Sequence, residues 1–113
     1  MNKVFVYGTL KMGFGNHRLL ENSELLGEET TDPRYTMVSL GGFPGVLKGG
    51  NTKIHGEVYA VNELTMKHLD RLEGYPNFYN RKTIETKYGD AWIYYLPRDQ
   101  YLGYCKVEDG VWK

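Results

Sequence analysis

The sequence predicts an α+β fold, in which a small barrel or curled mixed sheet has a helix packed across it. Several short runs have strand-like patterns, and one stretch has helical spacing. The two kinds of segment do not alternate regularly, as they would in a doubly wound sheet. The 113 residues are close to the commonest size of one domain, and no repeat or linker interrupts them. We therefore expect one domain over residues 1–113.

Strand-like runs recur along the whole chain. Residues 3–7 are mostly β-branched and aromatic, which predicts a buried strand that ends at Gly8. Residues 53–61 alternate between two faces and predict a central strand, where Gly56 indicates close approach of another backbone or a ligand. The other expected strands lie around Leu25–Leu26 and at residues 35–40, 46–48, 81–88 and 91–96, the last two joined by a hairpin at Gly89–Asp90.

A helix is predicted between Asn62, a suitable N-cap, and Gly74, a typical stop residue. At about 100° per residue, Glu73 lies at the edge of an apolar face. The predicted members of this face are Val61, Leu64, His68, Leu69 and Leu72. A shorter helix is expected from Asn16 to about residue 21.

Glu73 is the candidate general base. Partial burial and the negative end of the helix dipole would both raise the pKa of its carboxyl group. A carboxyl group with a raised pKa suits proton transfer near neutral pH. The alternative is a solvated glutamate that frays with the helix end, and the spacing alone leaves both readings open.

The turn after the first strand, residues 8–11, is a second candidate element. A join from strand to turn to helix exposes backbone N–H groups, which can form an anion-binding nest; a plain turn is the alternative. The turn is not a P-loop, because no Gly-Lys-Ser/Thr follows. It is not a dinucleotide fingerprint either, because Arg18 occupies the third glycine position.

Composition excludes several classes of partner. Lys plus Arg and Asp plus Glu both number 14, and zero net charge argues against nucleic acid or an anionic membrane as the main partner. No apolar run approaches the roughly 18 residues of a membrane span, and the N-terminus is too short and ends too soon for a signal peptide. The single cysteine, Cys105, fits a reducing compartment, so we expect a cytoplasmic protein. We also expect the protein to be a monomer or a weak homodimer.

Other catalytic arrangements find little support. The two serines, Ser23 and Ser39, lie in no Gly-x-Ser-x-Gly elbow, and a lone cysteine such as Cys105 is more often inert. His17, His55 and His68 lack metal-ligand spacing, so we expect neither a metal nor another cofactor. His68 is expected in the core or an interface, and His55 in a structural role. Elimination leaves a site built from one carboxylate, backbone amides and tyrosines.

Five short motifs together resemble a known family. They are residues 4–11 (VFVYGTLK), 15–17 (GNH), 42–45 (GFPG), 56–61 (GEVYAV) and 69–76 (LDRLEGYP), followed by Tyr79 and Arg81. Over about residues 3–90 the chain resembles the γ-glutamylcyclotransferase-like superfamily, most of all the γ-glutamylamine cyclotransferases and their small bacterial and phage relatives. The Tyr-Gly-Thr-Leu form at residues 7–10 favours this branch over the enzymes of γ-glutamyl amino acids, which resemble Tyr-Gly-Ser-Asn.

The resemblance implies a fold, a reaction and a site. The fold would be a small mixed β-barrel of about five to seven strands flanked by one or two helices. The reaction would convert a γ-glutamyl amine, such as γ-glutamyl-lysine, to 5-oxoproline and a free amine without an enzyme nucleophile. Glu73 would be the general acid and base, and Tyr79 would line the pocket and bond to the substrate or to Glu73. The predicted substrate-binding residues are Tyr7, Gly8, Thr9, Leu10 and Tyr79.

Two alternatives keep the same fold. One is a non-catalytic module that binds a small carboxylate or a partner protein, and the other is an enzyme that releases a γ-glutamyl group from a larger conjugate. Residues 97–113 match the motifs little and could shape the leaving-amine pocket, as an edge strand or a packed arm. Four aromatic residues are candidate pocket walls, with core packing as the alternative for each: Tyr35, Phe43, Tyr75 and Phe78.

Overall fold

The computed structural model describes residues 2–97 and 99–113. Within them the chain forms seven strands, one α-helix and two short 3₁₀ helices, which confirms the predicted α+β class. The elements in order are β1 (Asn2–Val6), η1 (His17–Leu20), β2 (Glu24–Thr30), β3 (Tyr35–Ser39), β4 (Pro44–Lys48), β5 (His55–Val61), α1 (Glu63–Glu73), β6 (Asn80–Thr86), β7 (Gly89–Tyr95) and η2 (Asp99–Gly103).

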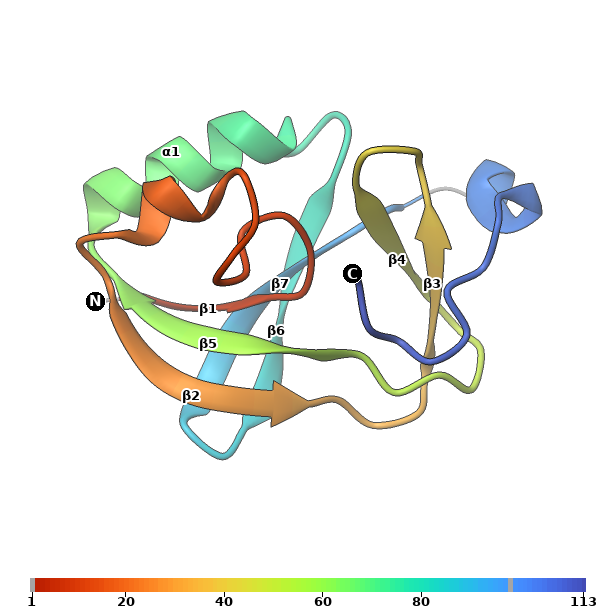
Figure 1. Cartoon of the computed structure of the whole chain (residues 1–113), viewed down its shortest axis with the longest axis horizontal. Helices are drawn as coiled ribbons and strands as arrows, with labels where there is room; N and C mark the ends of the chain where they lie inside the picture. The colour runs from red at the N-terminus through yellow and green to blue at the C-terminus, as the bar shows by residue number, and fades with distance from the viewer. Residues whose placement is uncertain (1, 98) are drawn as a thin grey trace.

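Five strands form a curved mixed sheet in the order β2-β5-β1-β7-β6 (Figure 1). Strand β1 is antiparallel to β5 and parallel to β7. Strands β3 and β4 form a separate hairpin. A hydrogen bond from the backbone N–H of Leu96, just after β7, to the carbonyl oxygen of Val46 in β4 connects this hairpin to the sheet. The predicted barrel is only approximate, because strand pairing does not close the sheet within the described residues: β3 and β4 pair with each other.

Strand β5 is interior, as predicted, since it lies between β2 and β1. Gly56 marks a close approach of backbone there. A Cβ atom at this position would lie 2.3 Å from the carbonyl oxygen of Val6 and 2.8 Å from the ring of Phe5. The side chain is absent because β1 occupies its space.

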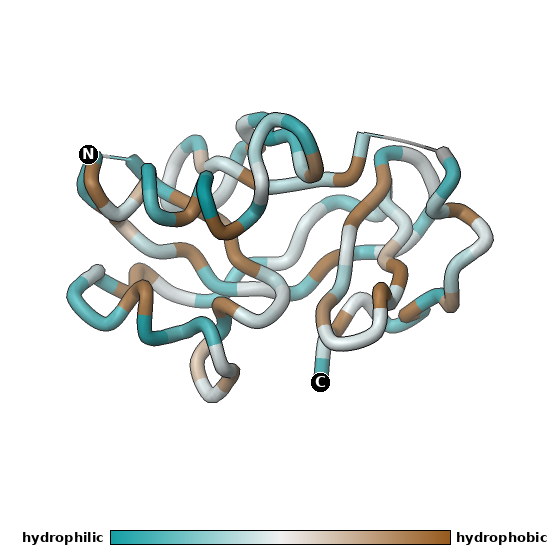
Figure 2. Tube along the Cα trace, turned by 90° about the horizontal axis from the view of Figure 1, so that it is seen from above, coloured by the Kyte–Doolittle hydropathy of each residue, from teal (hydrophilic) through white to brown (hydrophobic). Residues whose placement is uncertain are grey.

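Both faces of the sheet are covered. Along β1, the buried side chains of Val4 and Val6 join one core cluster, which also contains Leu69 of α1. The intervening Phe5 joins a second cluster, which contains Val46 of the hairpin. Figure 2 shows short hydrophobic stretches distributed among hydrophilic and intermediate ones along the trace. No helix in the described part of the chain is long and apolar enough to span a membrane.

The bounds of α1 agree with the prediction. The side chain of Asn62 accepts a 2.8 Å hydrogen bond from the backbone N–H of Thr65, which caps the first turn. Gly74 ends the helix in the left-handed conformation, with φ at 66°.

The predicted apolar face of α1 was right for Val61 and Leu69, which are buried, and wrong for its other members. Met66 and Leu69 are the buried residues, whereas Leu64 is 62% exposed and Leu72 is 40% exposed. His68 is exposed as well, so it does not belong to the core.

Two acidic residues explain the error. At about 100° per residue, Met66, Leu69, Asp70 and Glu73 fall within an arc of about 100°. This arc faces the rest of the protein, and half of its members are carboxylic acids with partly buried side chains. Glu73 therefore lies within the inward face rather than at the edge of an apolar one.

The last hairpin turns two residues earlier than predicted. Its turn is Lys87–Tyr88, because Thr86 pairs with Gly89 across the two strands. The hydroxyl group of Thr86 accepts a bond from the N–H of Tyr88 and donates one to the carbonyl oxygen of Gly89. These side-chain bonds stabilise the turn before Gly89 rather than at it.

The first short helix is a single 3₁₀ turn, His17–Leu20, rather than a helix from Asn16 to residue 21. The side chain of Asn16 makes no capping bond, because its amide group donates to the hydroxyl oxygen of Thr9 at 2.8 Å.

The C-terminal residues form a packed arm. The backbone N–H of Val107 donates to the Met37 carbonyl oxygen, and His55 N–H donates to the Gly110 carbonyl oxygen. Only an isolated bridge between Val38 and Lys106 resembles strand pairing in the described part of this segment. The arm therefore fastens the β3–β4 hairpin to the start of β5.

Candidate active site

A cavity of about 280 Å³ opens where the loop after β1, the β3–β4 hairpin and the end of α1 meet. This volume is close to the lower limit of about 300 Å³ for small-molecule sites, so the cavity suits a small substrate. The lining residues are Phe5, Val6, Tyr7, Gly8, Thr9, Leu10, Asn16, Gly42, Phe43, Pro44, Leu72, Glu73, Phe78, Tyr79 and Tyr94.

The structure brings all six predicted site residues to this cavity. They come from segments more than 60 positions apart in the sequence, and the fold unites them because β1 and α1 cover the same part of the core. The six are Tyr7, Gly8, Thr9, Leu10, Glu73 and Tyr79.

A paired capping arrangement fixes the position of Glu73 at the helix end. The N–H of Gly74 donates to the carbonyl oxygen of Arg71 at 3.2 Å, and the N–H of Tyr75 donates to that of Asp70 at 2.9 Å. These two bonds form a Schellman motif. The carbonyl oxygen of Glu73 also accepts from the N–H of Tyr79. The helix end and the following loop therefore hold the carboxyl group in place.

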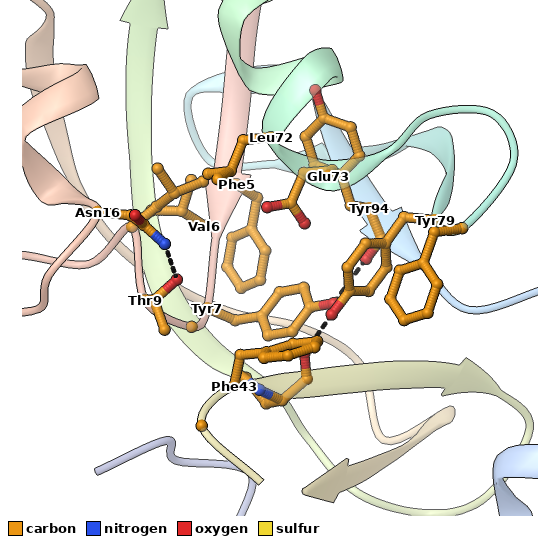
Figure 3. Close-up of a pocket in the computed structure, with 15 residues that line it drawn as sticks. Phe5, Val6, Tyr7, Thr9, Asn16, Phe43, Leu72, Glu73, Tyr79 and Tyr94 are labelled. Carbon is orange, nitrogen blue, oxygen red and sulfur yellow. Dashed lines mark hydrogen bonds between the residues drawn. The ribbon is translucent and has the colours of Figure 1, made fainter. Parts of the chain in front are cut away.

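The carboxyl group of Glu73 points into the space between Phe5, Tyr7, Tyr79 and Tyr94 (Figure 3). Burial raises its pKa from 4.5 to about 7, in the predicted direction. None of the described residues donates a hydrogen bond to it. It is thus free to exchange a proton with a bound molecule near neutral pH.

The loop on the other side of the cavity offers backbone donors. The N–H groups of Gly8, Thr9 and Leu10 make no hydrogen bond within the described residues. The loop is nevertheless fixed, because Lys11 N–H donates to the carbonyl oxygen of Gly8, and Asn16 N–H to that of Thr9, both at 3.0 Å. Uncommitted N–H groups on a fixed loop can hold a carboxylate or an oxyanion.

The two predicted tyrosines are held by the backbone. The hydroxyl group of Tyr7 donates to the carbonyl oxygen of Tyr94 at 2.8 Å, and that of Tyr79 donates to the carbonyl oxygen of Pro44 (Figure 3). Burial raises the pKa of both phenols. Their protons are committed to carbonyl groups, so both tyrosines are walls of the cavity. Tyr79 was expected to bond to the substrate or to Glu73, and in the structure its hydroxyl group donates to Pro44 instead of Glu73.

Sequence reasoning missed an ionic cluster behind the cavity. The hydroxyl group of Tyr94 donates to Asp70 at 2.7 Å, and Arg81 Nε lies 3.6 Å from the same carboxylate oxygen. The guanidinium group of Arg81 lies between the rings of Tyr75 and Trp92, at 4.6 and 4.3 Å from their centroids. This cluster fixes Tyr94, whose ring lines the cavity. The sequence offered one signal for this cluster: Asp70 lies three residues before Glu73 and therefore on the same face of the helix.

The remaining aromatic candidates divide into two groups. Phe43 and Phe78 line the cavity. Tyr35 belongs to the second core cluster, and Tyr75 packs on Arg81.

The histidines lie apart from one another. His17 packs on Tyr59, with ring centroids 5.8 Å apart, and His55 contacts the hydroxyl group of Thr30 at 3.0 Å. Across residues 2–97 and 99–113, no three His, Cys, Asp or Glu side chains gather closely enough to hold a metal ion. Cys105 is exposed.

Comparison with known proteins assigns the class. The model of the family "Gamma-glutamyl cyclotransferase, AIG2-like" matches residues 4–113. The chain belongs to this family, as the motifs predicted. The match continues through the C-terminal arm, so the arm is part of the family pattern and not an unrelated tail.

Individual relatives agree. A putative gamma-glutamylcyclotransferase of Vibrio cholerae is 46% identical over 109 residues, which make up 96% of this chain and 93% of that protein. The gamma-L-glutamyl-butirosin B gamma-glutamyl cyclotransferase of Niallia circulans is 33% identical and covers 90% of this chain and 71% of its own length. The solution NMR structure of Escherichia coli protein ytfP has a TM-score of 0.79 at 39% identity, covering 97% and 95% of the two chains.

Proposed function

We propose that this protein is a cyclotransferase that converts a γ-glutamyl amine to 5-oxoproline and a free amine, with Glu73 as general acid and base. One observation carries the proposal: a partly buried carboxyl group with a pKa of about 7 shares a small cavity with the uncommitted N–H groups of Gly8, Thr9 and Leu10. Family membership supports the type of reaction.

In the first step, the carboxylate of Glu73 accepts a proton from the α-ammonium group of the substrate. The α-amine then attacks the γ-carbonyl carbon, so that a C–N bond forms and the carbonyl oxygen becomes negative. Backbone N–H groups of residues 8–10 hold this oxygen or the substrate carboxylate. A folded substrate positioned for ring closure gains roughly 7–11 kcal/mol from the intramolecular geometry.

In the second step, the tetrahedral intermediate expels the amine. The original amide C–N bond breaks, and Glu73 returns its proton to the leaving nitrogen. The ring nitrogen still carries a second proton, which passes by way of the freed Glu73 carboxylate to the departing amine. The products are 5-oxoproline and the amine as its ammonium ion, and no water is consumed. One carboxyl group performs these transfers, which a pKa near neutrality favours.

The test is an assay of 5-oxoproline and released amine with a panel of γ-glutamyl amides that includes γ-glutamyl-lysine. The matching α-glutamyl amides are negative substrates, because their free amine and amide carbonyl cannot close the same ring. We expect turnover of γ-glutamyl substrates only, and a loss of at least about 10²-fold in Glu73→Gln. Glu63→Gln is the control, because Glu63 is an exposed acid in the first turn of the same helix. Equal turnover by Glu73→Gln and Glu63→Gln would remove Glu73 from the mechanism.

A second candidate is release of a γ-glutamyl group from a larger conjugate, and the name of the Niallia circulans relative favours it. Turnover of bulky γ-glutamyl conjugates but not of small amides would select this alternative. If no γ-glutamyl compound is converted while a small carboxylic acid raises the melting temperature, the protein is a binding module.

A further inference from the structure

We propose that the mouth of the cavity is a subsite for the leaving amine, and that it favours an uncharged apolar amine, aromatic ones above all, over an amine that carries a second charge. This inference rests on the proposed function and adds to it the chemical class of the substrate.

Three large apolar side chains meet at the cavity although each is well exposed. Phe43 is 39% exposed, Leu72 is 40% exposed and Phe78 is 38% exposed. They come from the β3–β4 hairpin, the last turn of α1 and the loop before β6. A single exposed apolar residue is ordinary, but three from separate segments around one opening form an apolar surface that a ligand can cover.

Contacts with neighbouring aromatic rings hold the aromatic part of this surface in place. The ring of Phe78 makes edge contacts with Phe43, Tyr79 and Tyr101, at centroid distances of 6.3, 4.9 and 6.1 Å. Tyr101 lies in η2, so the C-terminal arm supports the wall of the mouth. Edge contacts of this kind fix ring orientation, and a fixed ring offers an aromatic ligand a defined stacking surface.

Charge complements the shape. Glu73 is the only acidic or basic side chain among the fifteen lining residues, which all belong to the described part of the chain. Glu73 is engaged by the reacting α-amine. A second ammonium group on the leaving amine would therefore lose water without gaining a carboxylate, and a carboxylate would gain no cation. A leaving lysine carries both an ammonium and a carboxylate group, so we expect γ-glutamyl-lysine to be a poorer substrate than an apolar γ-glutamyl amide.

The experiment compares γ-glutamyl-benzylamide with two charged counterparts, γ-glutamyl-cadaverine and γ-glutamyl-lysine, by release of 5-oxoproline. We expect kcat/KM to be at least about tenfold higher for the benzylamide. Phe78→Ala should lower kcat/KM for the benzylamide about tenfold more than it lowers kcat/KM for γ-glutamyl-methylamide, mainly through KM. Leu64→Ala is the matched control, because Leu64 is an exposed apolar residue of α1 outside the cavity.

The possible results distinguish a failure of the proposed subsite from a failure of the proposed cyclotransferase activity. Turnover that depends on Glu73 but favours the charged amines overturns the subsite and leaves the cyclotransferase proposal standing. Absence of turnover with every γ-glutamyl compound overturns both. If Phe78→Ala lowers the melting temperature, Phe43→Ala gives the same comparison with the neighbouring ring of the mouth. Equal losses for the benzylamide and the methylamide in both variants would also contradict the subsite.

Discussion

The hydroxyl group of Tyr7 donates a 2.8 Å hydrogen bond to the backbone carbonyl oxygen of Tyr94, and the donor is buried. The bond ties the beginning of the donor loop to β7. Tyr7→Phe leaves this carbonyl group without its partner, so we expect a loss of about 1–3 kcal/mol in the free energy of unfolding, measured by urea denaturation. The control is Tyr88→Phe, which removes an exposed bond of 3.4 Å to Glu28. If Tyr7→Phe costs no more than this control, the buried bond contributes little.

The raised pKa of Glu73 predicts the pH dependence of activity. The carboxyl group must be ionised to accept a proton, and its pKa is about 7. We expect kcat/KM to fall about tenfold per pH unit on the acid side of this value. A pH–rate profile on one γ-glutamyl amide measures the inflection. An inflection near 4.5 would show that the carboxyl group titrates as an ordinary glutamate and is not buried during catalysis.

The same shift predicts a pH dependence of stability. Glu73 has a pKa of about 7 in the folded protein and about 4.5 when solvated, so the unfolded chain ionises first as the pH rises. Stability therefore falls between about pH 4.5 and 7 and stays lower above this window.

Glu73→Gln removes the ionisation and should stabilise the protein above pH 7. The full shift corresponds to about 3 kcal/mol, and because the carboxyl group meets solvent in the cavity we expect ~1–2 kcal/mol. At pH 4 the two proteins should differ little. Denaturation curves at pH 4 and pH 8 provide the comparison, and a mutant that is less stable than the wild type at pH 8 would contradict the desolvation of Glu73.

Gly56 should tolerate no side chain. The Cβ atom of Gly56→Ala would meet the Val6 carbonyl oxygen at 2.3 Å, and this backbone atom belongs to a paired strand that cannot move freely. We expect a loss of about 2 kcal/mol or more in the free energy of unfolding. Gly103→Ala is the control, since nothing lies within 4 Å of a Cβ atom there. Similar melting temperatures for the two variants would show that β1 and β5 can separate at little cost.

Local sequence signals predicted the ends of α1 well. Asn62 caps the helix through its own side chain, and Gly74 ends it because a left-handed residue is needed there. Both effects depend on neighbouring residues only. The central place of β5 was predictable for a similar reason, because its alternating pattern and its glycine reflect contacts on both sides of the strand.

The inward face of α1 was not predictable from hydrophobicity. Asp70 and Glu73 occupy inward positions because Asp70 binds Tyr94 and Arg81 while Glu73 faces the cavity. Polar residues at these positions shift the apolar pattern toward Leu64, which is exposed. Local patterns commonly disagree with the fold where a site is built, and here the disagreement marks the site itself.

The pairing of the strands into one sheet could not be predicted from the sequence either. The residue patterns of β6 and β7 indicate strands, but they do not indicate which other strands lie beside them. Tyr94 entered the site through the parallel pairing of β7 with β1, which joins residues about 90 positions apart. Long-range pairing of this kind has no local signature in a single sequence.

The place of β1 between β5 and β7 also sets an order of events during synthesis. Strand β1 leaves the ribosome first, but one of its neighbours is β7, and the arm that fastens the hairpin follows later still. Until those residues emerge, one long edge of β1 remains open to other chains. The nascent chain therefore cannot complete its sheet until the residues of β7 have emerged, and rapid synthesis would shorten the time during which the exposed edge can aggregate.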